Sequence, residues 1–144
     1  MIDATKDKRA YLNTLNSLTS CLLELGKYKD ANDRIETALP IANQLNDADL
    51  ENITLYNKAL VLYYMGNFRE AIEINTKVIK HLESIKKKEY ESGLQSAYMS
   101  QFSLYAELGM ESTDYWYQKV MATNPGEKQL AIIYLNYARF QNIL

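Results

Sequence analysis

Few side chains in this sequence could perform chemistry, and their spacing does not build a catalytic site. His81 is the only histidine and Cys21 the only cysteine, so any Ser/His/Asp or Cys/His arrangement would depend on a single residue. A zinc ion would lack its usual second imidazole, and a disulfide would lack its second thiol. Glu24 and Glu107 each stand two residues before a glycine, but a carboxylate that recurs at equivalent positions is typical of a solvated helix face. We therefore expect no enzyme, no metal and no cofactor.

The charge balance and the apolar runs argue against two further classes of function. Sixteen Lys and Arg against eighteen Asp and Glu give a net charge of −2. The chain therefore lacks the excess of positive charge that favours direct contact with nucleic acid. The longest apolar run, Ala59 to Met65, is far shorter than the roughly 20 residues of a membrane span, and no signal peptide is visible. We expect a cytoplasmic protein that makes no contact with a membrane.

The length of 144 residues predicts a single domain over residues 1–144. The five glycines and two prolines are few for this length, which favours an all-α fold with long helices. Three of the glycines, Gly26, Gly66 and Gly109, follow one another at intervals of 40 and 43 residues. Large residues recur eleven, four and one positions before each of them, a spacing that places them on one helical face. They are Leu15, Leu22 and Leu25; Leu55, Leu62 and Met65; and Tyr98, Tyr105 and Leu108. Each glycine is expected to end its helix in the left-handed conformation.

A second amphipathic helix follows each of the first two turns, with an aromatic residue and then an alanine at its start. Pro40 is expected to kink the first of these helices, and Asn46 and Asp47 are expected to end it and to cap the next helix. Trp116 is expected to anchor a less regular third hairpin, and Cys21 to be a small buried residue. The expected helices cover residues near 4–25, 28–45, 48–65, 68–88, 90–108, 112–122 and 127–143.

A helical hairpin that recurs with a Gly-x-aromatic turn resembles the tetratricopeptide (TPR) repeat. The family's turn markers match Gly26 with Tyr28 and Gly66 with Phe68, and its early alanine matches Ala31 and Ala71. The resemblance implies a right-handed TPR-like superhelix of about three and a half helical hairpins, with seven helices. Its units would span about 4–47, 48–89 and 90–125, followed by a half unit over 126–144.

The period exceeds the usual TPR length of about 34 residues, and the extra residues are expected in the second helix and its exit, as in 77–88. Long-period repeats resemble the C-terminal TPR domain of bacterial peptide-responsive regulators (the Rap and PlcR type) and the kinesin light chain. The segment Ala38 to Ala42 is more similar to the regulators, which implies the ligand-sensing part of a transcription regulator with a role in quorum sensing. The last helix stops one residue before its turn glycine, so we expect a fragment of a longer protein.

The resemblance also implies a site, because the first helix of each TPR unit lines a concave face. Those positions lie thirteen, ten, six and three residues before the turn glycine. The candidate peptide-binding residues are Asn13, Asn16, Ser20, Tyr56, Leu60, Tyr63, Ser96, Met99, Ser103 and Arg139. Asn amides can pair with a peptide backbone, and Tyr combines apolar area with a polar tip. We expect a short peptide or a protein segment as the partner.

A second hypothesis is a structural adaptor or dimerisation segment of a larger TPR protein. The apolar segment from Ile132 to Phe140 would be its interface, and a homodimer therefore stays open.

Overall fold

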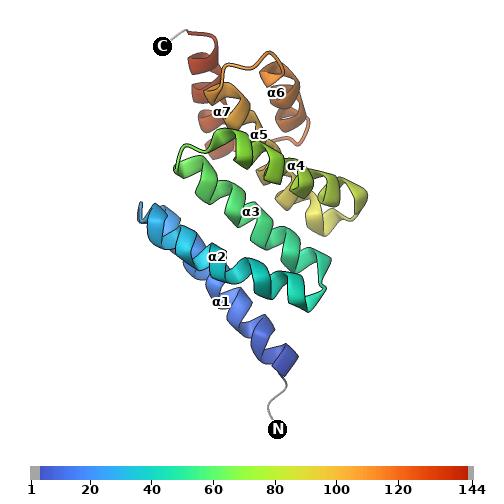
Figure 1. Ribbon diagram of the computed structural model, residues 1–144. Helices are drawn as coiled ribbons and strands as arrows, with labels where there is room; N and C mark the ends of the chain where they lie inside the picture. The colour runs from blue at the N-terminus through green and yellow to red at the C-terminus, as the bar shows by residue number, and fades with distance from the viewer. Residues whose placement is uncertain (1–3, 143–144) are drawn as a thin grey trace. The chain divides into compact units, whose positions relative to one another are not determined.

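The computed structural model describes residues 4–142, which form seven α-helices and one short 3₁₀ helix and contain no strand (Figure 1). The helices are α1 (Ala4–Glu24), α2 (Tyr28–Leu45), α3 (Ala48–Tyr64), α4 (Phe68–Ser84), η1 (Lys88–Tyr90), α5 (Glu91–Glu107), α6 (Thr113–Met121) and α7 (Glu127–Phe140). The all-α prediction is confirmed. The predicted continuation of α4 to residue 88 is wrong, because α4 ends at Ser84 and a separate 3₁₀ turn follows. The end of the last predicted helix, residue 143, lies outside the described residues.

The chain forms two compact units that divide after Asn67. In the first unit α2 packs on α1 and α3, and α1 also contacts α3. In the second unit α5 packs on α4, α6 and α7. In each unit, the first helix of a hairpin (α1 or α5) therefore contacts the second helix of the same hairpin (α2 or α6). It also contacts the first helix of the next hairpin (α3 or α7). The predicted hairpin over 48–89 takes one helix from each unit and stays a prediction, as does the superhelical path.

The three repeat glycines end their helices as the sequence predicts. Gly26, Gly66 and Gly109 have φ values of 71°, 82° and 60°, which side chains with a Cβ adopt only with strain. The Gly26 amide donates to the Leu23 carbonyl at 3.0 Å, and the Lys27 amide donates to the Leu22 carbonyl at 2.9 Å. Equivalent pairs of bonds follow Gly66 and Gly109. They satisfy carbonyl groups that the end of the helix would otherwise leave unpaired.

The core of the first unit depends on small residues in α2. Ala31, Ile35, Ala38 and Ala42 are fully buried, and alanine at three of these four positions lets α2 approach its neighbours closely. Leu15 is buried in the same core, and α2 continues through Pro40.

One large repeat residue lies outside this core, and one expectation about the core is wrong. Leu25, which follows the last residue of α1, is 69 % exposed. Cys21 is exposed as well. Cys21 lies two residues from the buried Thr19, which corresponds to about 200° around a helix with 3.6 residues per turn. The two side chains therefore point to nearly opposite sides of α1.

Aromatic side chains fill much of the core of the second unit, whereas small side chains fill much of the core of the first. Phe102 is 1 % exposed, and its ring centroid lies 5.9 Å from that of Tyr117. Trp116 of α6 lies 6.1 Å from Tyr98 and 5.9 Å from Tyr105, both in α5, measured between ring centroids. Trp116 therefore anchors this hairpin as predicted, and large rings compensate for the short α6 of nine residues.

One repeat position ties a first helix to the second helix before it. Lys58 and Gln101 each stand eight residues before a turn glycine. Lys58 of α3 pairs with Glu36 of α2, while the Gln101 amide donates to the Thr76 hydroxyl of α4 at 3.0 Å. The Gln101 carbonyl also accepts from the Asn75 amide at 2.8 Å. Glu36 and Thr76 both stand ten residues after a turn glycine, so the same bridge recurs with different chemistry.

The two bridges should differ in their contribution to stability. Gln101 is fully buried, whereas the Lys58 and Glu36 side chains are 11 % and 53 % exposed, so the carboxylate of this pair remains in contact with water. We expect Gln101→Met to lower the free energy of unfolding by about 1–3 kcal/mol because it leaves a buried amide with fewer partners. The matched Lys58→Met should cost less, about 0–1 kcal/mol, because the Glu36 carboxylate that loses its partner is half exposed and stays hydrated. Urea denaturation of both variants measures this difference, and equal losses would contradict it.

The junction between α2 and α3 is fixed by a cap and an ion pair. Asn46 adopts a left-handed conformation at φ 51° and ends α2. The Asp47 carboxylate accepts from the amides of Asp49 and Leu50, each at 3.1 Å, and from the Arg9 guanidinium at 2.6 Å. The hydrogen bond from Arg9 and then that from the Leu50 amide hold the pKa of Asp47 below its usual value of 3.8.

Removing this cap should destabilise the first unit. We expect Asp47→Ala to cost about 0.5–2 kcal/mol of unfolding free energy, the usual range for a lost N-cap. Because the folded pKa is lowered, this stabilisation is complete above pH 3.8 and is lost as the pH falls through the lower folded value. Thermal unfolding at pH 7 and at pH 3 measures both effects. Asp33→Ala, which removes an exposed carboxylate within α2, is the control and should change stability little.

Candidate functional site

The first unit carries the first six candidate residues along α1 and α3. Asn13 and Ser20 are exposed on α1, whereas Asn16 is only 6 % exposed. Tyr56, Leu60 and Tyr63 of α3 are half-buried. This face therefore offers exposed polar groups on one helix and partly covered apolar area on the other.

The Asn16 amide joins α1 to α3. Its nitrogen donates to the Thr54 hydroxyl at 3.1 Å, and its oxygen accepts from the Asn57 amide at 3.1 Å. A buried amide with these partners serves the packing of the two helices. We therefore leave Asn16 out of the candidate site and retain its exposed neighbours.

Aromatic contacts hold the tyrosines at the end of α3. Tyr64 stacks on Tyr28 with ring centroids 5.2 Å apart, and Tyr63 meets Tyr64 edge-on at 5.3 Å. Their rings are ordered by these contacts, which lowers the entropy that a ligand would have to remove on binding.

One candidate residue of the second unit, Arg139, lines a cavity between α5 and α7, and Ser103 contacts another residue of its lining. The cavity has a volume of about 210 Å³ and is lined by Ala106, Glu107, Asn136 and Arg139. The Asn136 amide donates to the Ser103 hydroxyl at 2.9 Å and fixes one wall. Ser96 and Met99 lie further along α5, partly buried, and do not line this cavity.

The residues that join neighbouring first helices were not predicted from the sequence. Asn57 and Asn136 occupy the same position of the repeat, nine residues before the place of the turn glycine, when α7 is aligned with α3. Each donates its amide to a side chain of the preceding first helix. A recurring asparagine at this position was the available signal.

The lining of the α5–α7 cavity includes a guanidinium, from Arg139, and a carboxylate, from Glu107, and both residues are exposed. Arg139 can donate to carbonyl or carboxylate oxygens, and Glu107 can accept from an N–H group. This pair suits recognition of a peptide bond or of a charged side chain. Within residues 4–142, no group of three His, Cys, Asp or Glu side chains could hold a metal ion.

No family model matches the chain, and no curated protein sequence matches it. None of the helices over residues 4–142 is long and apolar enough to cross a membrane. Among solved structures, the chain is similar to the TPR domain of Arabidopsis FLU, with a TM-score of 0.70 and 24% sequence identity. The match covers 80% of this chain and 95% of the FLU domain. This likeness, together with the seven helices and their glycine turns, shows that the chain has a TPR-like helical repeat fold.

Proposed function

We propose that this chain is a non-catalytic protein-binding module that takes a short peptide or protein segment on the exposed sides of its first helices. The observation that carries the proposal is the α5–α7 cavity, which lies at the repeat positions expected to line a binding face. Ala106 and Arg139 stand at those positions, and both line the cavity.

The chemistry of both units supports an extended peptide as ligand. Arg139 and Glu107 offer a donor and an acceptor to the peptide backbone. Ile132 and Leu135, which are 52 % and 45 % exposed on α7, add apolar area near that cavity. In the first unit, Ser20 and the Tyr56 ring offer the same combination of polar and apolar contact.

The long repeat period supports a finer proposal, that the chain is the ligand-sensing part of a cytoplasmic, peptide-responsive bacterial transcription regulator. Its mechanism would be a population shift, in which a peptide binds one arrangement of the helices better than another. The shift in population would be passed on to an attached effector.

Peptides selected on the intact chain from a random displayed library test the binding proposal. We expect Arg139→Ala or Tyr56→Ala to weaken the selected peptides at least about tenfold, which corresponds to about 1.4 kcal/mol of binding free energy. Fluorescence polarisation with labelled peptides provides the dissociation constants.

Two matched variants control for loss of charge and of an aromatic ring. Lys80→Ala removes an exposed cation of α4, and Tyr11→Ala removes an exposed ring on α1 two residues from Asn13. Neither should change the affinity. If the peptides bind Arg139→Ala and Tyr56→Ala as tightly as the unchanged protein, the binding site lies elsewhere on the chain.

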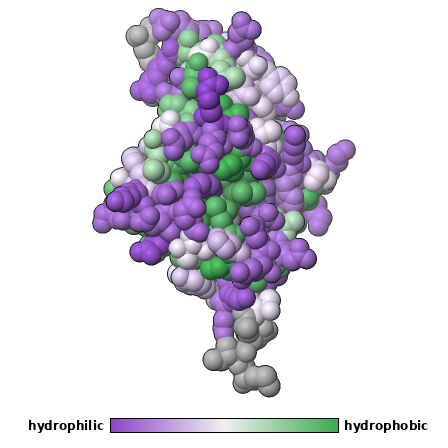
Figure 2. Space-filling view, in the orientation of Figure 1, coloured by the Kyte–Doolittle hydropathy of each residue, from purple (hydrophilic) through white to green (hydrophobic). Residues whose placement is uncertain are grey.

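An exposed apolar segment of α7 favours a second candidate function, self-association. Ile132, Tyr134 and Leu135 are 52 %, 52 % and 45 % exposed, and Figure 2 shows that hydrophobic residues reach the surface among hydrophilic ones. Adjacent large apolar residues of this kind are common in protein interfaces. Phe140 is less suitable as a contact, because it is half-buried and packs near Tyr137.

Light scattering separates this candidate from a monomeric peptide binder. If α7 forms a dimer, Leu135→Asp should convert the dimer to a monomer, because the interface would bury an unpaired charge. Leu25→Asp, at a residue 69 % exposed in the first unit, should leave the oligomeric state unchanged. A protein that is monomeric at every concentration would exclude this second function.

A further inference from the structure

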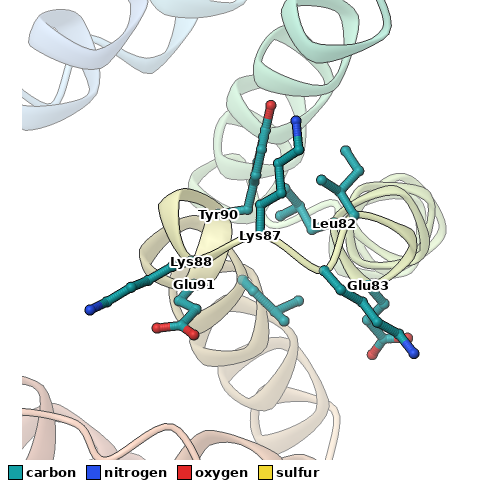
Figure 3. A pocket seen from close by; sticks show the side chains of 9 residues that line it. Leu82, Glu83, Lys87, Lys88, Tyr90 and Glu91 are labelled. Carbon is teal, nitrogen blue, oxygen red and sulfur yellow. The ribbon is translucent and has the colours of Figure 1, made fainter.

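The contact between α4 and α5 shows how a second helix covers the first helix that follows it. The connection between the two helices leaves a cavity of about 250 Å³, the α4–α5 cavity, whose lining includes Leu82, Leu94 and three lysines (Figure 3). Away from this cavity, the Asn75 amide of α4 donates to the Ala97 carbonyl at 2.9 Å and to the side-chain oxygen of Gln101 at 2.8 Å, both in α5. Ala97 and Gln101 are fully buried, so this part of α5 is closed to solvent under α4.

Three positions of the repeat are covered in this way. They stand twelve, eight and five residues before the turn glycine, and they are Thr54, Lys58 and Val61 in α3 and Ala97, Gln101 and Leu104 in α5. The Lys58 side chain is 11 % exposed, and the other five residues are at most 1 % exposed. Lys58 pairs with Glu36 of α2, and Gln101 donates to Thr76 of α4. Helix α2 therefore lies over this face of α3, and α4 lies over the same face of α5.

The same three positions are exposed in α1. They are Thr14, Leu18 and Cys21, and Leu18 is 39 % exposed. Tyr11 is 51 % exposed and lies two turns before Leu18 on the same side of the helix. Helix α1 packs on α2 and α3, whereas α5 packs on α4, α6 and α7. These four residues therefore form an outer face of α1 at the place where α3 and α5 each carry a second helix.

The outer face of α1 carries groups that suit burial in an interface. No charged residue occurs between Arg9 and Glu24, just as none occurs between Glu91 and Glu107 of α5. In α5 this uncharged stretch is covered by three helices, and charged residues are depleted at the centres of protein interfaces. The Thr14 hydroxyl donates to a backbone carbonyl of its own helix at 2.9 Å. Covering the outer face would therefore leave this hydroxyl hydrogen-bonded.

The outer face lies away from the candidate peptide-binding residues of α1. Five residues separate Leu18 from Asn13, which corresponds to about 140° around a helix with 3.6 residues per turn. Ser20 lies two residues from Leu18, or about 200° around the helix. A ligand on either face therefore leaves the other face accessible.

We propose that the outer face of α1 binds an amphipathic α-helix of a partner protein, which packs on α1 as α2 packs on α3 and α4 packs on α5. The partner helix has a small residue at the position of Ala31 in α2 and Ala71 in α4. Because Leu18 stands where α3 has Lys58, the partner helix has an apolar residue in place of Glu36. Removing both apolar groups from water favours the complex.

Among the residues that the structure describes, a second copy of this chain has no spare helix of this kind. The buried residues of α2 and of α4 are already packed within their own units, and α6 has only nine residues. The exposed residues of α7 include Ile132 and Leu135, which are larger than the alanines of α2. The helix that fits α1 is therefore assigned to a different protein.

A peptide made from residues 68–84 tests the proposal, because α4 keeps its alanine and contains no proline. The peptide carries Asn75→Ile, which matches Ile35 at the same position of α2, and Thr76→Leu, which supplies the apolar residue for Leu18. A lactam bridge joins Glu73 and Lys77, which are exposed in α4 and four residues apart, and holds the peptide helical. In a nuclear magnetic resonance titration of the intact chain, it should shift the amide signals of residues 10–22 in a saturable way.

Exchanging the residues at one pair of positions tests the specificity of this contact. A second peptide with Thr76→Glu in place of Thr76→Leu should bind the unchanged protein at least about tenfold more weakly, because its carboxylate would be buried against Leu18 without a partner. The protein variant Leu18→Lys should reverse this preference and bind the Thr76→Glu peptide more tightly, as Lys58 pairs with Glu36. Labelled peptides and fluorescence anisotropy provide the four dissociation constants.

Leu25→Lys is the matched control for the added charge. Leu25 is exposed at a position that is exposed in α3 as well, where Met65 is 45 % exposed. This variant should keep the preference of the unchanged protein. Both Leu18 and Leu25 are exposed, so the amide spectrum of each variant shows whether the fold is kept.

Three results would overturn the proposal. The first is an equal preference of the unchanged protein and Leu18→Lys for the two peptides. The second is a change in the signals of residues 10–22 with the concentration of the chain alone, which would assign the outer face to a second copy. The third is the same shifts with vesicles of phosphatidylcholine and phosphatidylglycerol in equal amounts, without binding of either peptide, which would assign the face to a lipid surface.

Discussion

The register between neighbouring helices depends on polar side chains at fixed positions of the repeat. Burial of apolar surface is non-directional, so apolar contacts alone hold two helices together without choosing one alignment. A buried amide costs free energy unless it meets a partner at the right distance. Gln101 has its partners on α4, and Asn16 has its partners on α3. Each therefore favours one alignment of the helices that it joins.

The same polar contacts determine which residues remain available to a ligand. Asn57 and Asn136 each bring two first helices together from one side. Residues about one turn further along the same helix faces, Ser20 after Asn16 and Arg139 after Asn136, stay exposed. The face that could bind a peptide and the contact that builds the repeat are thus neighbouring parts of one helix surface.

The sequence predicts those features that depend on single residues and their immediate neighbours. The left-handed glycines and the Asp47 cap follow from local backbone chemistry, and the period of the repeat identifies the helices. The burial of Asn16 and the exposure of Cys21 depend on which helix covers which turn. Helical periodicity shows which residues share a face, but it does not show how far a neighbouring helix extends along that face. The α5–α7 cavity could not be predicted for the same reason.

The unequal glycine intervals have a structural cause that bears on the α4–α5 cavity. In the first unit two residues connect α2 to α3, whereas six residues, including η1, connect α4 to α5. Since α4 is one residue shorter than α2, these four additional connecting residues account for the interval of 43 instead of 40. The extra length therefore lies in the exit from α4 and not within the helix. A connection of two residues brings α2 directly to α3, but the longer one leaves Leu82 and Leu94 only partly covered and places three lysines around them. A departure from the repeat period has thus produced a cavity at a connection that is four residues longer than its counterpart in the first unit.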